Sequence, residues 1–203
     1  MPARTVREEA DLRTQTLDAA RSLIAERGHR DLSMREIARA VGCSVSSLYL
    51  YFESRDALIH TLIDEGFQRW YDEQLALNER WLDPWARLEA AARRYVEFGV
   101  ENPELYEIMY MFHPRSLERL PKELYRRIRR SLDLTAANVL ACAAPGGAMT
   151  EADARTVAAA AWATLHGVVS TLLTHRLDSR IDRAGYVDRA VRMVMDGVRA
   201  CAG

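Results

Sequence analysis

The sequence predicts an all-α protein in which a three-helix N-terminal segment precedes a C-terminal helical bundle, about nine helices in all. Two observations lead to this fold class. Apolar residues recur at spacings of three and four along most of the 203 residues, and no segment shows the strict alternation of a half-buried strand. Residues that begin and end helices stand between these periodic segments, as in globular helical proteins.

The first two helices are marked by their caps. The first runs from about Arg7 to Arg27, and Gly28 closes it because glycine accepts the left-handed conformation common after a helix. Ser33 and Glu36 form the Ser-x-x-Glu pattern of a capping box, which begins a second helix. Gly42 ends that helix, so the next helix follows after a tight turn.

The following two helices begin at serines. Ser44 caps a short third helix that extends from Val45 to about Phe52. Ser54 caps a fourth, which begins at Arg55 and reaches about Leu77. We expect a functional boundary inside this fourth helix, which divides the chain into an N-terminal domain, residues 1–58, and a C-terminal domain, residues 59–203.

The C-terminal helices are marked by Asp-Pro or Asn-Pro pairs, by proline, by a second capping box and by glycine. Proline suits the first turn of a helix, where its missing N–H has no partner to lose. The five expected starts are Asp83-Pro84, Asn102-Pro103, a position near Pro121, Thr150 with Asp153, and the residues after Gly185.

Composition limits the classes of function. The formal net charge is −1, so a nucleic-acid-binding surface must concentrate its basic groups locally. Cys43, Cys142 and Cys201 stand far apart, which predicts neither a disulfide framework nor a zinc site. The polar N-terminus and the lack of a long apolar run predict a cytoplasmic protein without a membrane segment.

Helices two and three have the layout of a helix-turn-helix. Ala38 is small where the two helices cross, and Gly42 can adopt the positive φ of the turn. Tyr49 and Tyr51 add hydroxyl groups at the edge of an apolar core, where they could contact phosphates. A helical hairpin in an ordinary soluble bundle is the alternative, and we favour DNA binding over it.

Residues 33–58 resemble the signature of the TetR (tetracycline-repressor-like) transcription regulators. The matching positions are Ser33, Ile37-Ala38, Val41-Gly42, Ser44, Leu48-Tyr49, Tyr51-Phe52, Ser54 and Leu58. The resemblance implies a bacterial one-component regulator that dimerises, binds a palindromic operator and is usually a repressor released by a ligand.

The resemblance also implies roles for individual residues. Ser33, Arg35 and Arg55 would contact phosphates, and Tyr49 and Tyr51 would contact backbone or base edges. The residues expected in the major groove are Ser44, Val45, Ser46 and Ser47. No lysine or arginine lies between residues 44 and 52, so serines, tyrosines, Val45 or the shape of the DNA must supply specificity.

The C-terminal half resembles one type of TetR-family C-terminal domain. The resemblance rests on the motif Trp162-x-x-x-His166-Gly167 and on the segment from Asn102 to Met109. It implies that the last two long helices pair with a second subunit. The residues expected at the dimer interface are Val168, Leu172, Val187, Ala190, Val191 and Val194. The alternative is that both helices complete a monomer core.

A ligand site is the other expectation for the C-terminal half. Aromatic and methionine side chains with a few polar tips are typical of small-molecule pockets. The candidates are Trp85, Tyr95, Phe98, Tyr106, Met109, Phe112, Trp162 and His166. An aromatic stripe at helical spacing is also common in a plain core, so core packing stays open for each of these residues.

We therefore expect a ligand-responsive regulator of transcription with double-stranded DNA and a small apolar or amphipathic effector as partners. No catalytic, metal or cofactor site is expected, because Glu26-x-x-His29 is a lone Glu-x-x-His and no phosphate-binding glycine loop is present. Three alternatives remain: an activator, a DNA-binding protein that senses no small molecule, and a carrier or enzyme bundle in which residues 33–58 are scaffold.

Overall fold

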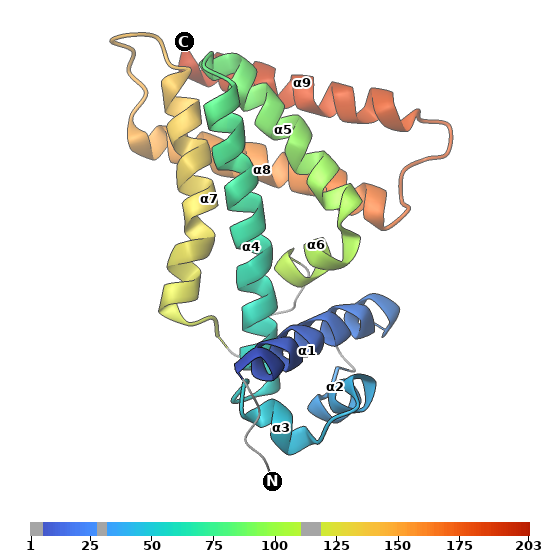
Figure 1. The fold of residues 1–203 in the computed structure, drawn as a ribbon. Helices are drawn as coiled ribbons and strands as arrows, with labels where there is room; N and C mark the ends of the chain where they lie inside the picture. Colours follow the sequence, from blue (N-terminus) through green and yellow to red (C-terminus); the bar gives the residue numbers. More distant parts are fainter. Residues whose placement is uncertain (1–5, 28–31, 111–118) are drawn as a thin grey trace. The chain divides into compact units, whose positions relative to one another are not determined.

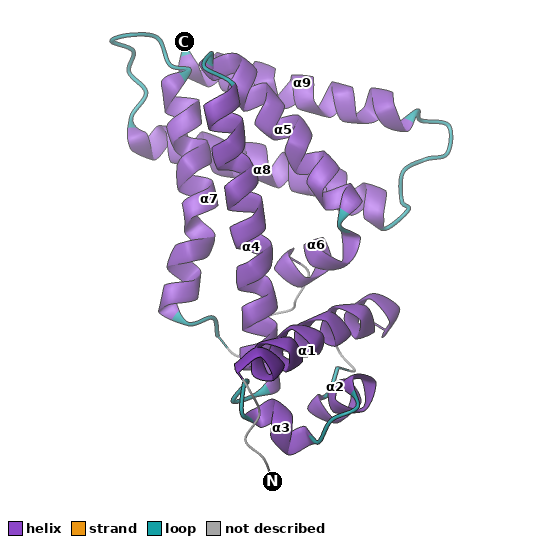
Figure 2. Ribbon diagram, viewed as in Figure 1, coloured by secondary structure: helices purple, strands orange, loops and turns teal. Residues whose placement is uncertain are grey.

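The computed structural model describes residues 6–27, 32–110 and 119–203 (Figure 1). These residues form helices joined by loops and contain no strand, so the all-α prediction is confirmed (Figure 2). The helices are α1 (Val6–Arg27), α2 (Met34–Val41), α3 (Val45–Tyr49), α4 (Arg55–Arg80), α5 (Pro84–Glu101), α6 (Pro103–Tyr110), α7 (Lys122–Ala141), α8 (Glu151–Leu173) and α9 (Arg183–Ala202).

The chain divides into two compact units. Unit 1 comprises residues 1–66 and 104–124, and unit 2 comprises residues 67–103 and 125–203. Helix α4 continues across the change from Gly66 to Phe67, so one boundary lies inside a helix. Most of α6 belongs to the unit that contains α1, α2 and α3.

The helices begin where the sequence predicts caps. Ser33 caps α2 and Ser44 caps α3, each with a side-chain oxygen that accepts from a backbone N–H three residues on. Asp83 does the same for α5, with Pro84 in its first turn. Thr150 and Asp153 form a complete capping box at α8, since each side chain binds the other residue's backbone N–H.

Helix α4 extends to Arg80, three residues beyond the expected end, and three other helix limits differ for local reasons. Helix α3 ends at Tyr49, because Tyr51 and Phe52 both direct their N–H groups to Leu48 O in a turn. Helix α8 ends at Leu173, because His175 has φ 53°, outside the helical region. Helix α9 begins at Arg183 rather than after Gly185, because Asp182 accepts from Gly185 N at 2.6 Å and caps it earlier.

Each unit has its own apolar core. In unit 1 the fully buried side chains come from α1 to α4 and from α6, and they include Ile24, Ile37, Leu48, Leu58 and Tyr106. In unit 2 they come chiefly from α5, α7, α8 and α9, and they include Phe98, Val139, Val169, Val191 and Met195.

The contact between α4 and α7 in unit 2 is polar, which the apolar spacing did not predict. Gln74 donates to Thr135 Oγ1 at 2.9 Å, and Asn78 and Asn138 exchange two amide hydrogen bonds of 3.3 and 3.0 Å. Two buried atoms of this contact, Gln74 Oε1 and Ser131 Oγ, have no hydrogen-bond partner within the described parts of the chain. Buried polar atoms are normally paired, so this contact differs from an ordinary helix interface.

Candidate nucleic-acid interface

The turn between α2 and α3 has the geometry of a helix-turn-helix. Gly42 lies at φ 76° and ψ 31°, and the Gly42 and Cys43 N–H groups satisfy carbonyls at the end of α2. A left-handed residue of this kind is favourable for glycine and costs energy for other residues. Ile37, Ala38 and Leu48 are buried between the two helices, so α3 is fixed against α2 by a small apolar core.

The serines at the start of α3 differ in their hydrogen bonds. Ser44 Oγ accepts from Ser47 N at 3.1 Å and lies 2.8 Å from Ser47 Oγ, so both hydroxyls take part in the cap. Ser46 is exposed and takes no part in these two contacts. Of Ser44, Ser46 and Ser47, Ser46 is therefore the exposed serine that the helix cap does not use.

Large side chains are exposed at the end of α3. Tyr49 is 52% exposed and Leu50 is 81% exposed. Val45 and Tyr51 are half-buried, and Phe52 behind them is buried. An isolated exposed leucine is ordinary, but Leu50 stands beside Tyr49 on the segment that carries the predicted DNA contacts. Leu50 was not predicted as a site residue.

Two exposed arginines of the N-terminal segment lie on the same helix. Residues 1–66 carry nine arginines and eleven acidic residues, so the segment as a whole does not attract DNA. Arg35 and Arg39 are both exposed, and they lie four residues apart on α2. Arg39 was not predicted from the sequence, although its spacing from Arg35 places the two on one face.

Arg55 is held within the domain. Its Nε donates to Leu32 O at 2.8 Å and its Nη1 donates to Asp56 Oδ1 at 3.0 Å. The bond to Leu32 O links the start of α4 to the residue that precedes the α2 cap. Arg55 therefore has a structural role that is separate from the phosphate contact predicted for it.

Helix α1 contacts other elements of unit 1 through two of its arginines. Arg21 pairs with Glu65 of α4, and Arg13 Nη1 lies 4.0 Å from the same carboxylate. The Arg13 guanidinium also lies 5.6 Å from the centroid of the Phe52 ring. These contacts connect α1 with α4 and with the segment that follows α3.

Four predicted ligand residues come together in unit 2. Trp162 Nε1 donates to Tyr95 OH at 3.0 Å, and the Trp162 and His166 rings stack with centroids 5.3 Å apart. Trp70, which was not predicted, lies 5.3 Å from the Tyr95 ring and 5.4 Å from the Phe98 ring. Tyr95 and Phe98 are buried, whereas Trp162 is 39% exposed, so the cluster extends from the core to the surface.

The other predicted ligand residues lie elsewhere. Tyr106 and Met109 are buried in unit 1, where the Tyr106 ring contacts the Tyr110 ring at 4.8 Å. Trp85 lies on α5 under the Arg199 guanidinium, ten residues or about 15 Å of helix before Tyr95. Phe112 lies outside the described residues, as does His29 of the Glu-x-x-His pattern.

The residues predicted at the dimer interface are largely buried within one chain. Val168 and Leu172 of α8, like Ala190, Val191 and Val194 of α9, are each less than a tenth exposed, and Val187 is half-buried. They are covered by other parts of the same chain and leave little surface for a second copy.

The opposite face of α8 is exposed and consists mostly of small residues. This helix is long and apolar enough to cross a membrane by length and composition alone, yet only 28% of its most apolar window is buried. Ala160, Ala163, Thr164 and Gly167 are exposed. A Cβ placed on Gly167 of α8 or on Gly197 of α9 would meet nothing within 4 Å.

Comparisons with known proteins agree with this geometry. Residues 17–62 match the model of the bacterial regulatory proteins of the tetR family, and residues 88–194 match the tetracyclin repressor-like C-terminal domain. The chain is 33% identical over 89 residues to the HTH-type transcriptional repressor KstR2 of Rhodococcus jostii, a match that spans 44% of each chain.

Two solved structures share the fold over nearly the whole chain. A protein of unknown function from Rhodococcus sp. RHA1 is 28% identical, with a TM-score of 0.75 and coverage of 95% of this chain and 96% of that one. The regulator FadR from Bacillus subtilis, solved in complex with stearoyl-CoA, is 18% identical, with a TM-score of 0.70 and coverage of 91% and 98%.

Proposed function

The chain belongs to the tetR family of bacterial regulatory proteins, and from this premise we propose that it is a repressor that binds a palindromic operator as a homodimer and is released by a small apolar or amphipathic effector. The observation that carries the DNA-binding part is the exposed surface of α3. Ser46, Tyr49 and Leu50 project from a short helix whose opposite side is buried against α2. We assign base contacts to this surface, and phosphate contacts to Ser33, Arg35 and Arg39 at the edge of α2.

Salt dependence tests the phosphate contacts. Each phosphate contact adds about 0.9 to the slope of log affinity against log salt, whatever the DNA sequence. Replacing Arg39 by glutamine should therefore weaken binding to every duplex and lower the slope by about 0.9. Arg192→Gln, a change at an exposed arginine of α9, is the matched control and should leave the slope unchanged. Equal slopes for both variants would remove the phosphate contact from α2.

We assign the dimer contact to the exposed face of α8, together with Gly197 of α9. The support is that this face is apolar, made of small residues and uncovered in one copy, while the residues first predicted are buried within the chain. Close packing of two such helices needs small side chains at the crossing. A palindromic operator has two-fold symmetry, and a homodimer matches it, which is the physical reason to expect a dimer.

Gly167→Leu tests that contact without threatening the fold. A Cβ at Gly167 meets nothing within 4 Å in one chain, and replacing glycine inside a helix removes its propensity penalty of about 1 kcal/mol. The variant should keep its helix content and become monomeric in sedimentation experiments. Ala137→Leu, at an exposed alanine of α7, is the control and should remain a dimer. A dimeric Gly167→Leu variant would place the contact elsewhere.

The effector assignment rests on the aromatic cluster around Trp162. Its hydrogen bond to Tyr95 and its stack on His166 connect an exposed ring to the buried core of unit 2. Aromatic walls with few polar groups suit an apolar or amphipathic molecule. The stearoyl-CoA complex of the fold-related FadR agrees with this class of effector.

A further inference from the structure

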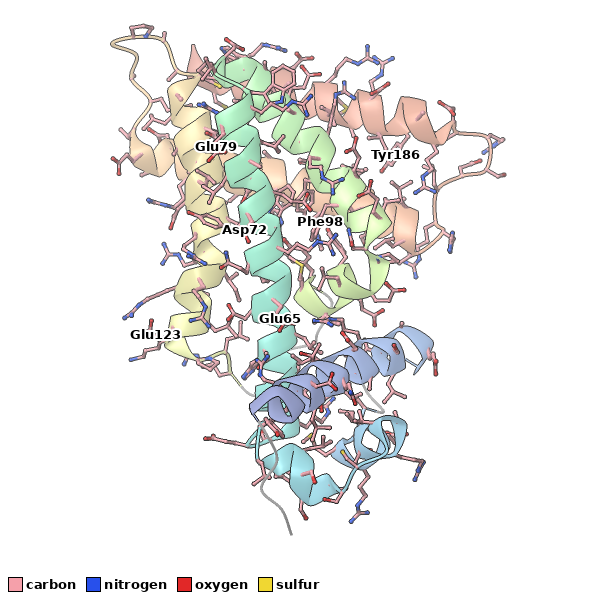
Figure 3. The ribbon with its side chains drawn as sticks, viewed as in Figure 1. Glu65, Asp72, Glu79, Phe98, Glu123 and Tyr186 are labelled. Atoms are coloured by element: carbon pink, nitrogen blue, oxygen red, sulfur yellow. The ribbon has the colours of Figure 1, made fainter. Side chains whose placement is uncertain are left out.

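The segment between residues 44 and 52, which contains α3, lacks the side chains that most often read bases. Direct recognition in the major groove relies mainly on arginine or lysine at guanine and on asparagine or glutamine at adenine. None of these residue types occurs in this segment. Nitrogen-tipped side chains project instead from the neighbouring helix α2, which carries Arg35 and Arg39 (Figure 3). Direct readout by α3 is therefore limited to hydroxyl groups and apolar contacts.

Leu50 is presented to solvent on a defined face of α3. Among the described residues of unit 1 it is the most exposed large apolar residue, at 81%. It is the C-cap of α3 and has φ −71° and ψ −22°, so the helical backbone extends to this position. Ser46 precedes Tyr49 by three residues and Leu50 by four, and the three therefore share one face. Leu48, on the opposite side of the helix, is buried.

The fold gives Leu50 no role that requires a leucine. Most of its side chain is exposed, so it contributes little to the core, and glycine or asparagine would suit the end of the helix better. A single exposed leucine is ordinary, but Leu50 adjoins Tyr49, which is 52% exposed, on the face assigned to base contacts. Local features without a structural gain are expected at functional sites. An apolar group on the DNA would account for this surface.

Thymine presents such an apolar group in the major groove. Its C5 methyl distinguishes a T·A pair from the other base pairs, and the O4 atom beside the methyl is a hydrogen-bond acceptor. A leucine side chain has no donor or acceptor, so it responds to the methyl and not to O4. The hydroxyl groups of Ser46 and Tyr49 can both donate and accept, and they discriminate less between bases. Leu50 is therefore the residue of this face with the most selective partner.

We propose that Leu50 is a specificity-determining residue that recognises thymine through its C5 methyl group. The inference rests on the proposed operator binding through α3, and it adds the chemistry by which a half-site is selected. Each half-site contains a T·A pair whose methyl packs against Leu50, while Ser46 and Tyr49 supply neighbouring hydroxyl contacts. The phosphate contacts assigned to α2 position the helix without choosing the sequence.

Competition binding to modified duplexes tests the methyl contact. The probe is the inverted repeat that the full-length protein selects from random duplexes. Each T·A pair of the half-site is replaced in turn, in both half-sites, by a deoxyuridine·A pair, which lacks only the methyl. At the position read by Leu50 this replacement should weaken binding about fourfold per half-site, the factor that corresponds to burial of one methyl group. Replacement of the same pair by 5-methylcytosine·G should weaken binding less than replacement by C·G, because the methyl is retained.

A double-mutant cycle between protein and DNA assigns the methyl contact to one side chain. Leu50→Ala should bind the thymine and deoxyuridine duplexes equally well at that position. Leu50→Asn, which keeps the size of the side chain but removes its apolar surface, should do the same. Leu82→Ala is the matched control, because Leu82 is 86% exposed in unit 2, and it should keep the full penalty for deoxyuridine. Melting temperatures of all three variants should match the parent protein, since each change is at an exposed position.

The outcomes separate this inference from the proposed function. A selected half-site without thymine, deoxyuridine that costs no affinity at any position, or a penalty that Leu50→Ala leaves unchanged would each overturn the inference. Operator binding would stand in all three cases, and specificity would come from hydroxyl contacts or from the shape of the DNA. A protein that selects no sequence at all would contradict the proposed function and this inference together.

Discussion

Burial determines the protonation of His166. The half-buried imidazole stacks on Trp162, and removal from water lowers its pKa below the ordinary value of 6.5. The folded protein therefore holds fewer protons than the unfolded chain at pH values between this lowered pKa and about 6.5. The contribution of His166 to the free energy of unfolding is complete above pH 6.5, and it decreases as the pH falls through that window.

We predict that replacing His166 by glutamine flattens this part of the stability profile. Urea unfolding at pH 5 and pH 7.5 should show a smaller difference for His166→Gln than for the parent protein. His175→Asn is the control, because His175 is exposed and asparagine tolerates its positive φ. Hydrogen bonds lower the pKa values of Asp153 and Asp188. Protonation of these carboxylates therefore destabilises the protein only in a more acidic range, outside the comparison between pH 5 and pH 7.5.

Some properties of single residues could be predicted from the sequence, and others could not. Ser46 could be predicted as an outward residue from the pattern of α3. The capping bond that occupies Ser44 and Ser47 depends on where the helix begins, and the bond from Arg55 to Leu32 O joins residues 23 apart. The cap by Ser44 is local and was predicted, whereas the Arg55–Leu32 pair is determined by tertiary structure and hydrophobic periodicity does not indicate it.

Helix α6 packs against α4 at a glycine. A Cβ on Gly66 would lie 2.7 Å from Met109 Cγ, 2.8 Å from Met109 Sδ and 3.0 Å from Leu105 Cδ1. All three residues belong to unit 1. The close approach of α6 to α4 therefore depends on the missing side chain at position 66.

We predict that Gly66→Ala destabilises the protein by about 1 kcal/mol. Overpacking costs about 1–3 kcal/mol and the gain in helix propensity returns about 0.5–1 kcal/mol. In a Met109→Ala background the same change should be neutral or stabilising, because the clashing side chain is gone. Urea unfolding of the four proteins in this double-mutant cycle gives the coupling directly. Additive effects would show that Met109 moves aside freely.

Helix starts were more predictable than helix ends. Asp83, Thr150 and Ser33 cap the residues that immediately follow them, so a local pattern is sufficient. Helix α8 ends before a histidine with positive φ, and no glycine marks the position. Gly185 suggested a break before α9, yet Asp182 caps that helix three residues earlier.

At the scale of the molecule, the sequence predicted the all-α class and a boundary inside the fourth helix, but not that residues 104–124 belong to unit 1. The segment 104–124 lies in the C-terminal half of the sequence and forms part of the same compact unit as the helix-turn-helix. Long-range contacts decide this, and no local pattern encodes them. The dimer face that we propose was missed for the same reason, since the apolar stripe of α8 and α9 is buried within the chain and the remaining face of α8 consists of small residues.

Selection of bound DNA from a pool of random duplexes is the measurement that tests the central claim most directly. A homodimer that presents two copies of α3 should enrich an inverted repeat whose half-sites lie about one helical turn apart, 10–10.5 bp centre to centre or a multiple of it. Ser46→Gln should change the bases selected within each half-site, while Arg39→Gln should lower recovery without changing them. A folded protein that enriches no motif, or that enriches the same motif with and without Ser46→Gln, would contradict the assignment of α2 and α3 as the operator-binding surface.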